Sequence, residues 1–272
     1  MAKLPYIISR LRLSQRGTVH LLLLGCLLVA PSRAKLLGVS TTMLLSTGNC
    51  ICEEARHVSE AATSLSRIAS FKNAVLDIQK AYISNKREYG LALERDSVRK
   101  GDRTVPIPGN IHSTSIGNLS GKLGDIHIHT DEKPPSSGDL YGFLDQAIKD
   151  SAYLRYILTP GNQLYALGLI DKAAAIQFLT LYPKRNGIRK KQADGTVLYF
   201  QPTFPQNMVE EFDQLKGWYN ASDEAAICFI LEKYNSGVGL FKRNAKGDFK
   251  RIYTEIKQNE NGNLLYMLRS CL

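Results

Sequence analysis

The longest periodic pattern of apolar residues lies between Glu53 and about Asn85, where they recur every three or four positions. This spacing places them on one side of an α-helix, and no proline interrupts the stretch. The pattern predicts an amphipathic helix, continuous or broken in two, that covers a sheet. The apolar positions behind this prediction are Val58, Ala62, Leu65, Ile68 or Ala69, Val75, Ile78 and Tyr82.

Shorter patterns, typical of strands, begin after this stretch. The segments from Glu88 to Leu93 and from Arg103 to Pro108 each predict a strand. The segment from Gly124 to His129 alternates with a period of two and contains β-branched residues, which is typical of a strand that ends in a loop. The residues between, Asn110 to Gly121, are rich in Ser, Thr, Asn and Gly and predict a loop.

The middle of the chain predicts alternating helices and strands. Ser136 or Ser137 can cap a helix that runs from Asp139 to about Ser151. Further strands are predicted at Tyr153 to Leu158 and Gln163 to Ile170, joined by the turn Thr159-Pro160-Gly161-Asn162, and a helix follows from about Lys172 to Leu179.

A basic connector, Pro183 to Gly195, separates the last part of the chain from the rest. We therefore predict an α/β domain of residues 35–182, followed by a small α+β extension of residues 196–272. The extension is expected to end in a small antiparallel sheet. Its predicted elements are a strand at Thr196 to Gln201, helices near Gln206 to Trp218 and Ser222 to Tyr234, and strands at Val238 to Lys242, Phe249 to Ile256 and Leu264 to Arg269.

The first 34 residues have the features of a targeting segment. A basic stretch ends at Arg16, an apolar run from Val19 to Ala30 follows, and Ser32-Arg33-Ala34 has the small residues that signal peptidase requires. The run is shorter than the ~20 residues of a membrane-spanning helix. We predict a cleaved signal peptide, residues 1–34, a periplasmic or secreted protein, and no stable transmembrane span after cleavage. The alternatives are lipid attachment at Cys26, because Leu23-Leu24-Gly25-Cys26 resembles a bacterial lipobox, or an uncleaved membrane anchor.

The formal net charge of +10 changes little in this picture. Residues 1–34 hold five of the 35 basic residues and no acidic residue, so about half of the excess charge belongs to the targeting segment. The most basic remaining run, Lys184 to Lys191, contains no aromatic residue that could stack on a base, and it predicts a solvated loop. No nucleic-acid partner is expected.

Export would allow disulfide bonds. The chain after residue 34 contains Cys50, Cys52, Cys228 and Cys271. Cys50 and Cys52 are too close in sequence for an easy mutual bridge, which leaves pairing of one of them with Cys228 or Cys271. The sequence alone does not choose between these pairings.

The residues that carry chemistry are His127-Ile128-His129 and, after a proline-containing loop, Ser136-Ser137-Gly138-Asp139. Two histidines at alternate positions of a strand end point to the same side, so both imidazoles could reach one ion. Asp139 in the first turn of a helix could supply a third ligand. Two imidazoles, one carboxylate and a water molecule make an open, catalytic type of zinc site. Glu88, at the start of an upstream strand, is the best candidate for the proton acceptor that such a site needs.

This combination resembles the JAMM/MPN-type zinc metallopeptidases, also called the JAB domain. Their pattern is a Glu on an upstream strand, then His-x-His, a loop, and Ser-x-x-Asp at the start of a helix. Glu88-Tyr89-Gly90-Leu91 resembles the Glu strand, His127 and His129 resemble the histidine pair, and Ser136 to Asp139 resembles the Ser-x-x-Asp. The resemblance covers roughly residues 54–181.

The resemblance implies a JAB-like (cytidine-deaminase-like) fold, a mixed sheet flanked by helices. It implies that His127, His129 and Asp139 bind Zn²⁺, that Glu88 is the general acid/base, and that Ser136 helps to hold the oxyanion. The expected function is zinc-dependent hydrolysis of a peptide or isopeptide bond, with a protein or peptide as substrate.

Two departures from the family pattern favour an alternative. The loop Thr130 to Pro135 has six residues, one fewer than is usual in the family, and Thr130 stands where proline commonly follows the second histidine. A misplaced Asp139 would lower activity steeply. The alternative is a catalytically inactive JAB-fold binding or structural protein of the cell envelope or of a mobile element. A secreted toxin or effector is a further reading of the same sequence.

Overall fold

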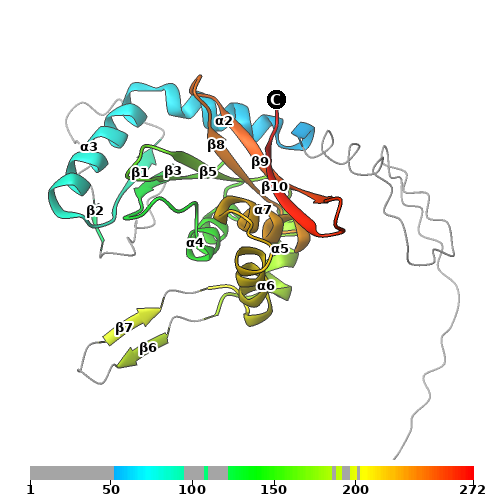
Figure 1. The fold of residues 1–272 in the computed structure, drawn as a ribbon. Helices are drawn as coiled ribbons and strands as arrows, with labels where there is room; N and C mark the ends of the chain where they lie inside the picture. Colours follow the sequence, from blue (N-terminus) through cyan, green and yellow to red (C-terminus); the bar gives the residue numbers. More distant parts are fainter. Residues whose placement is uncertain (1–51, 95–106, 110–121, 186–187, 192–196, 201–202) are drawn as a thin grey trace, which may run out of the picture. The chain divides into compact units, whose positions relative to one another are not determined.

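The structure is a computed structural model that describes residues 52–94, 107–109, 122–185, 188–191, 197–200 and 203–272 (Figure 1). The predicted signal peptide and Cys50 lie outside the described residues, as do the loop from Asn110 to Gly121 and most of the strand predicted at Arg103 to Pro108. The described part is a mixed α/β fold, as the sequence predicts.

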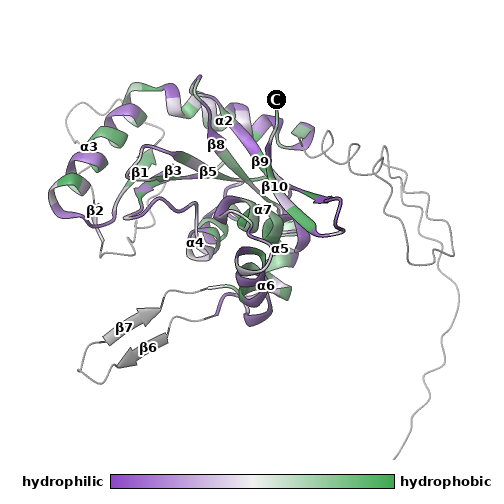
Figure 2. Cartoon of the chain, in the orientation of Figure 1, coloured by the Kyte–Doolittle hydropathy of each residue, from purple (hydrophilic) through white to green (hydrophobic). Residues whose placement is uncertain are grey.

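The first long periodic stretch forms two helices, α2 (Arg56–Arg67) and α3 (Ala69–Asn85). Ile68 separates them because its backbone is extended, with φ −69° and ψ 152°. Of the two predicted possibilities, the structure contains the helix broken in two. Figure 2 shows alternating hydrophobic and hydrophilic segments along both helices. Their buried residues, among them Val58, Ala62, Phe71, Ala74 and Ile78, pack against the sheet.

Eight strands form one sheet in the order β10-β9-β8-β5-β4-β3-β1-β2. Among the described strands, β3 and β4 are the one parallel pair. A parallel pair needs a crossover connection, which here contains helix α4 (Ser137–Ala147). The strands are β1 (Tyr89–Glu94), β2 (Ile107–Pro108), β3 (Lys122–Ile128), β4 (Leu154–Leu158), β5 (Leu164–Leu169), β8 (Val238–Arg243), β9 (Phe249–Gln258) and β10 (Leu264–Ser270).

Helices cover both faces of this sheet. Alternate strand residues point to opposite sides, so Tyr156 of β4 joins the core under α2 and α3, whereas Ile157 joins the core on the other side. That second core also contains α4, α5 (Lys172–Leu181), α6 (Gln206–Gly217) and α7 (Asp223–Lys233). None of the helices in the described ranges has the length and apolar character needed to cross a membrane.

The three C-terminal strands continue the main sheet. They pair antiparallel with one another, as the sequence predicts, but they do not form a small sheet of their own, because β8 also pairs antiparallel with β5 in the register Leu167↔Leu240. Val238 and Leu240 of β8 enter one core and Phe241 enters the other. A strand that is apolar on both faces is a central strand.

The basic connector contributes one strand of a hairpin, whose other strand is the one predicted at Thr196 to Gln201. Strands β6 (Ile188–Lys191) and β7 (Val197–Phe200) pair antiparallel, and an isolated bridge between Arg185 and Thr203 closes the base of the hairpin. The loop prediction is therefore wrong for Ile188–Lys191. The charged composition predicts a solvated segment, but a solvated segment can still form the backbone hydrogen bonds of a hairpin.

One disulfide ties the start of the described chain to its end. Cys52 bonds to Cys271, with their Cα atoms 5.5 Å apart. Cys228 is a buried free thiol on α7. Of the pairings that the sequence leaves open, the structure contains Cys52–Cys271, and it joins the segment before α2 to the residue after β10.

Candidate metal centre

The strand register places three of the expected site residues on one face of the sheet. Ile126 and Ile128 point into the core under α2 and α3, so His127 and His129 lie on the opposite side. The antiparallel pairing of β1 and β3 sets Gly90 opposite His127. Tyr89 and Leu91 of β1 point into the core under α2 and α3, so Glu88 also lies on the side of the histidines. All three side chains are buried.

The start of α4 explains why a Ser-x-x-Asp sequence holds its carboxylate in place. Ser136 is the N-cap residue, and its Oγ accepts a hydrogen bond from the backbone N–H of Asp139. In return, the backbone N–H of Ser136 donates to Oδ2 of Asp139 at 2.7 Å. This capping box satisfies two backbone donors and fixes the Asp139 side chain. Ser137, the other capping candidate, instead shares a hydrogen bond with Thr203.

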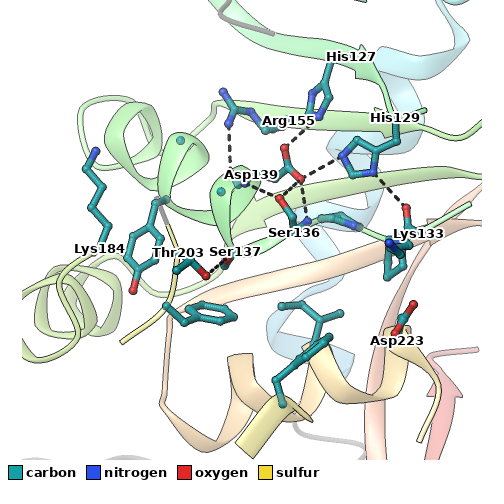
Figure 3. A pocket seen from close by; sticks show the side chains of 18 of the residues that line it. His127, His129, Lys133, Ser136, Ser137, Asp139, Arg155, Lys184, Thr203 and Asp223 are labelled. Carbon is teal, nitrogen blue, oxygen red and sulfur yellow. Dashed lines mark hydrogen bonds and ion pairs between the residues drawn. The ribbon is translucent and has the colours of Figure 1, made fainter. Parts of the chain in front are cut away.

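The two histidines and Asp139 converge at one point, as the sequence predicts. Nε2 of His127 lies 2.9 Å from Oδ1 of Asp139, and Nε2 of His129 lies 3.1 Å from Oδ2. Figure 3 shows both rings directed toward this carboxylate. One ligand atom from each of the three residues lies within 4.8 Å of the other two, close enough for a single cation to bind all three.

These residues fit a divalent metal ion in chemistry as well as in position. Nδ1 of His129 is 3.2 Å from the carbonyl oxygen of Lys133. Donation from Nδ1–H to that carbonyl leaves the Nε2 lone pair free for a metal, and metal-binding histidines are commonly oriented in this way. Two imidazoles and one carboxylate suit Zn²⁺ and also other first-row divalent ions. Three protein ligands leave a coordination position open.

The electrostatics of the metal-free cluster favour a positive charge at its centre. Burial alone would lower the pKa of His129, but the adjacent Asp139 carboxylate raises it to about 9. Burial would likewise raise the pKa of Asp139, but His127 and His129 hold it well below its usual range. The buried carboxylate therefore stays ionised, and a bound cation would replace the proton of His129.

Glu88 lies in the same cavity as this cluster but has a different environment. It is 7% exposed, and burial raises its pKa to about 7, although the nearby His129 opposes the shift. A carboxyl group with this pKa can both accept and release a proton near neutral pH. The structure thus brings the predicted general base to the predicted metal ligands.

The sequence interpretation missed Asp125 and Arg155, a charged pair that contacts the backbone of Asp139. Arg155 of β4 donates two hydrogen bonds to the fully buried carboxylate of Asp125, both 2.9 Å long, and Nη1 of Arg155 donates to the backbone oxygen of Asp139. A Cβ atom on Gly142 would lie 2.3 Å from Nη1, so glycine leaves room for the guanidinium. The available signal was an acidic residue inside β3 and a basic residue inside β4.

A cavity of about 880 Å³ contains the cluster, and residues from the last third of the chain line part of it. Lys184 and Thr203, which flank the β6–β7 hairpin, face the cavity (Figure 3). The sequence interpretation missed this wall because no local motif links it to the histidines. The lining residues from this part of the chain are Lys184, Thr203, Phe204, Val209, Phe212, Lys216, Asp223 and Ile227.

Comparison of the sequence with family models and curated proteins adds no relative to this description. No protein-family model matches the chain, and no curated protein sequence matches it significantly. The resemblance to JAMM/MPN-type peptidases therefore rests on Glu88, on the His127 and His129 pair, and on the segment Ser136 to Asp139.

Proposed function

We propose that this protein is a zinc-dependent hydrolase of peptide or isopeptide bonds, of the JAMM/MPN (JAB) type. One observation carries the proposal: Nε2 of His127, Nε2 of His129 and the carboxylate of Asp139 converge in a cavity that also contains the buried carboxyl group of Glu88. A mixed sheet with helices on both faces supports the JAB-like fold.

In this proposal His127, His129 and Asp139 hold the ion. When bound, the ion would polarise the substrate carbonyl and lower the pKa of a water molecule. Glu88 accepts a proton from the attacking water at a carboxylate oxygen, and afterwards donates it to the nitrogen of the leaving amine. In the metal-free protein, burial raises the pKa of Glu88 to about 7.

Ser136 has two roles in the proposal. Its hydroxyl group donates to Oδ2 of Asp139 at 2.7 Å and helps to hold that carboxylate. The residue is exposed and lines the cavity. Rotation about its Cα–Cβ bond would turn the hydroxyl toward a substrate carbonyl oxygen, where it would donate a hydrogen bond to the developing negative charge.

The position of Asp139 favours an active enzyme over the inactive alternative, because Asp139 reaches both histidines although the loop is one residue shorter than is usual in the family. The loop's own Lys133 carbonyl lies within hydrogen-bonding distance of His129, and Pro134 and Pro135 are buried. This difference in loop length is thus accommodated before α4 begins. The ion-pair distances of 2.9 and 3.1 Å at Asp139 support this interpretation.

We also propose that the protein is exported, to the periplasm or the medium. The Cys52–Cys271 disulfide supports this proposal, because such bonds persist mainly in oxidising compartments.

Metal analysis tests the proposed site. Protein stripped with a chelator and reloaded with zinc should retain about one Zn²⁺ per chain. The His127→Ala and Asp139→Asn variants should lose it, because each removes a ligand. The His57→Ala variant is the matched control, since His57 is an exposed histidine of α2. Wild-type protein that keeps far less than one zinc, or variants that keep as much as wild type, would contradict the site.

Hydrolysis is tested with a mixed peptide library, whose products are identified by mass spectrometry. The Glu88→Gln variant should keep its zinc and lose about 10²- to 10⁴-fold in rate, because the proton acceptor is gone. Unchanged hydrolysis in this variant would remove Glu88 from the mechanism. Wild-type protein that binds zinc but cleaves no peptide or isopeptide would favour the inactive binding protein.

A further inference from the structure

The cavity has an apolar wall that comes from a part of the chain with no role in the metal cluster. Phe204 precedes α6, Val209 and Phe212 lie on α6, and Ile227 lies on α7. Phe204 and Ile227 are almost fully buried, at 4% exposure each. Val209 and Phe212 are half-buried. Val209 and Phe212 therefore provide most of the apolar surface that a ligand could contact.

This wall is fixed to the helix that carries Asp139. Oγ of Ser137, in the first turn of α4, lies 2.9 Å from Oγ1 of Thr203. The ring of Phe204 packs edge-on against Tyr141 of α4, with ring centroids 5.9 Å apart. The hydroxyl of Tyr141 in turn donates to the carbonyl of Tyr182. The wall thus keeps a defined position beside the metal ligands.

The charged residues around the cavity compensate one another. Lys184 pairs with Asp145 at 2.8 Å, Lys133 pairs with Asp131 at 2.9 Å, and Lys216 pairs with Asp223. All six residues line the cavity. Within each of these three pairs the lysine and aspartate charges offset each other, so the pairs give a charged substrate side chain little net attraction. The apolar wall is the feature left to select a side chain.

We propose that Val209 and Phe212 form a subsite for a large apolar side chain, such as leucine or phenylalanine, of a peptide held at the metal cluster. This inference rests on the proposed function and names its substrate class. A cavity of about 880 Å³ lies within the range of small-ligand pockets, so it accommodates a short extended segment and not a folded domain. Differences in apolar contact of this kind change kcat/KM by about 10- to 200-fold.

Peptides that differ at one position test the subsite. A sequence taken from the library products is resynthesised with Leu, Phe, Ala, Asp or Lys beside the scissile bond, and kcat/KM is measured for each. Wild-type protein should prefer Leu or Phe over Ala by at least about tenfold. Cleavage without such a preference, or with a preference for Asp or Lys, would overturn the subsite and leave the proposed hydrolase standing.

Two variants of α6 should change the preference in opposite directions. Val209→Trp fills the subsite and should reduce the ratio of kcat/KM for the Leu peptide to that for the Ala peptide. Phe212→Ala enlarges it and should shift the optimum from Leu toward Phe. A folding defect would lower all substrates together and leave these ratios unchanged, which would count against the subsite. Gln214→Ala, at an exposed position of α6 that does not line the cavity, is the matched control.

Binding separates the two proposals. Short peptides of one fixed sequence that carry Leu, Phe, Ala, Asp or Lys at a single position are titrated into zinc-loaded Glu88→Gln protein and into the Glu88→Gln/Val209→Trp double variant by calorimetry. Tighter binding of the Leu and Phe peptides that is lost in the double variant supports the subsite, even if wild-type protein cleaves nothing and the hydrolase proposal fails. Equal binding of all peptides, or no binding, overturns the subsite whatever the hydrolysis assay shows.

Discussion

Strand β3 has two faces of opposite character, although alternate residues of the same strand build both. Toward α2 and α3, the face consists of buried apolar side chains such as Ile126 and Ile128 of β3. Toward α4, the same strand presents Asp125 and His127, which are also buried. One strand therefore contributes to a well-packed core on one side and to a polar cluster with an open cavity on the other.

The comparison shows what a buried polar face requires. A buried charge without a partner is strongly unfavourable. Here the carboxylate of Asp125 is held by Arg155, and the imidazole of His127 is held by Asp139. Each polar group depends on a partner from another element, whereas the apolar face needs only close packing. The apolar face should therefore set the stability of the protein, and the polar face should set its affinity for metal.

Substitution of two neighbouring residues separates these contributions and should give the largest effect. Ile126→Ala leaves a cavity in the apolar core and should lower the free energy of unfolding by about 2–5 kcal/mol, while zinc bound per folded chain stays unchanged. His127→Ala should cost the metal-free protein less and should abolish tight zinc binding. Urea unfolding of metal-free protein and zinc titration measure the two quantities. Equal losses of both quantities in both variants would contradict the division between the faces.

Glu88 offers a second test, because its burial should cost stability. Burial raises its pKa from 4.5 to about 7, so between these pH values the folded state binds a proton that the unfolded state releases. Stability therefore falls as the pH rises through this window, and the full cost, up to about 3 kcal/mol at ~1.4 kcal/mol per pH unit, remains above pH 7. Metal-free Glu88→Gln protein should exceed wild type in stability by up to that amount at pH 8, and by much less at pH 4.5.

Unfolding midpoints at several pH values measure this difference. Glu60→Gln, at an exposed position of α2, is the control, and its difference from wild type should stay flat across the same range. A Glu88→Gln variant that is no more stable than wild type at pH 8 would mean that the Glu88 carboxylate is well solvated in the folded protein.

The sequence predicts that His127, His129 and Asp139 lie together, because the information is local. Strand periodicity alone puts His127 and His129 on one side, and the cap at Ser136 fixes the start of the helix that holds Asp139. Most helices and strands are predicted to within a few residues for the same reason, since each depends on periodicity and turn residues within a short segment.

The remaining features could not be predicted because they depend on contacts between distant segments. Turn signals locate the strand Val238–Arg243 but do not reveal that it pairs with β5. The cavity wall at Val209 and Phe212 forms only when α6 joins the same core as α4, and no motif records that packing. The charges of Asp125 and Arg155 are visible in the sequence, but their pairing depends on the parallel register of β3 and β4.

The smallest of the expected effects concerns that charge pair. Because Arg155 joins the carboxylate of Asp125 to the backbone oxygen of Asp139, it should act as a positioning residue for the metal ligand. Residues that orient metal ligands typically contribute 10- to 100-fold to metal affinity. Arg155→Met alone would leave a buried carboxylate without its cation, so the test uses the double variant Asp125→Asn/Arg155→Met. Its zinc affinity, measured by competition with a chromophoric chelator, should fall by about that factor.

A second variant displaces the same guanidinium without removing a charge. A Cβ at Gly142 would lie 2.3 Å from Nη1 of Arg155, so Gly142→Ala should weaken zinc binding in the same direction but less strongly. Arg67→Met breaks the exposed ion pair with Asp248 and should leave zinc affinity unchanged. The double variant could instead unfold more easily and yet bind zinc as tightly as wild type. In that case Arg155 would stabilise the fold without positioning Asp139 for the metal.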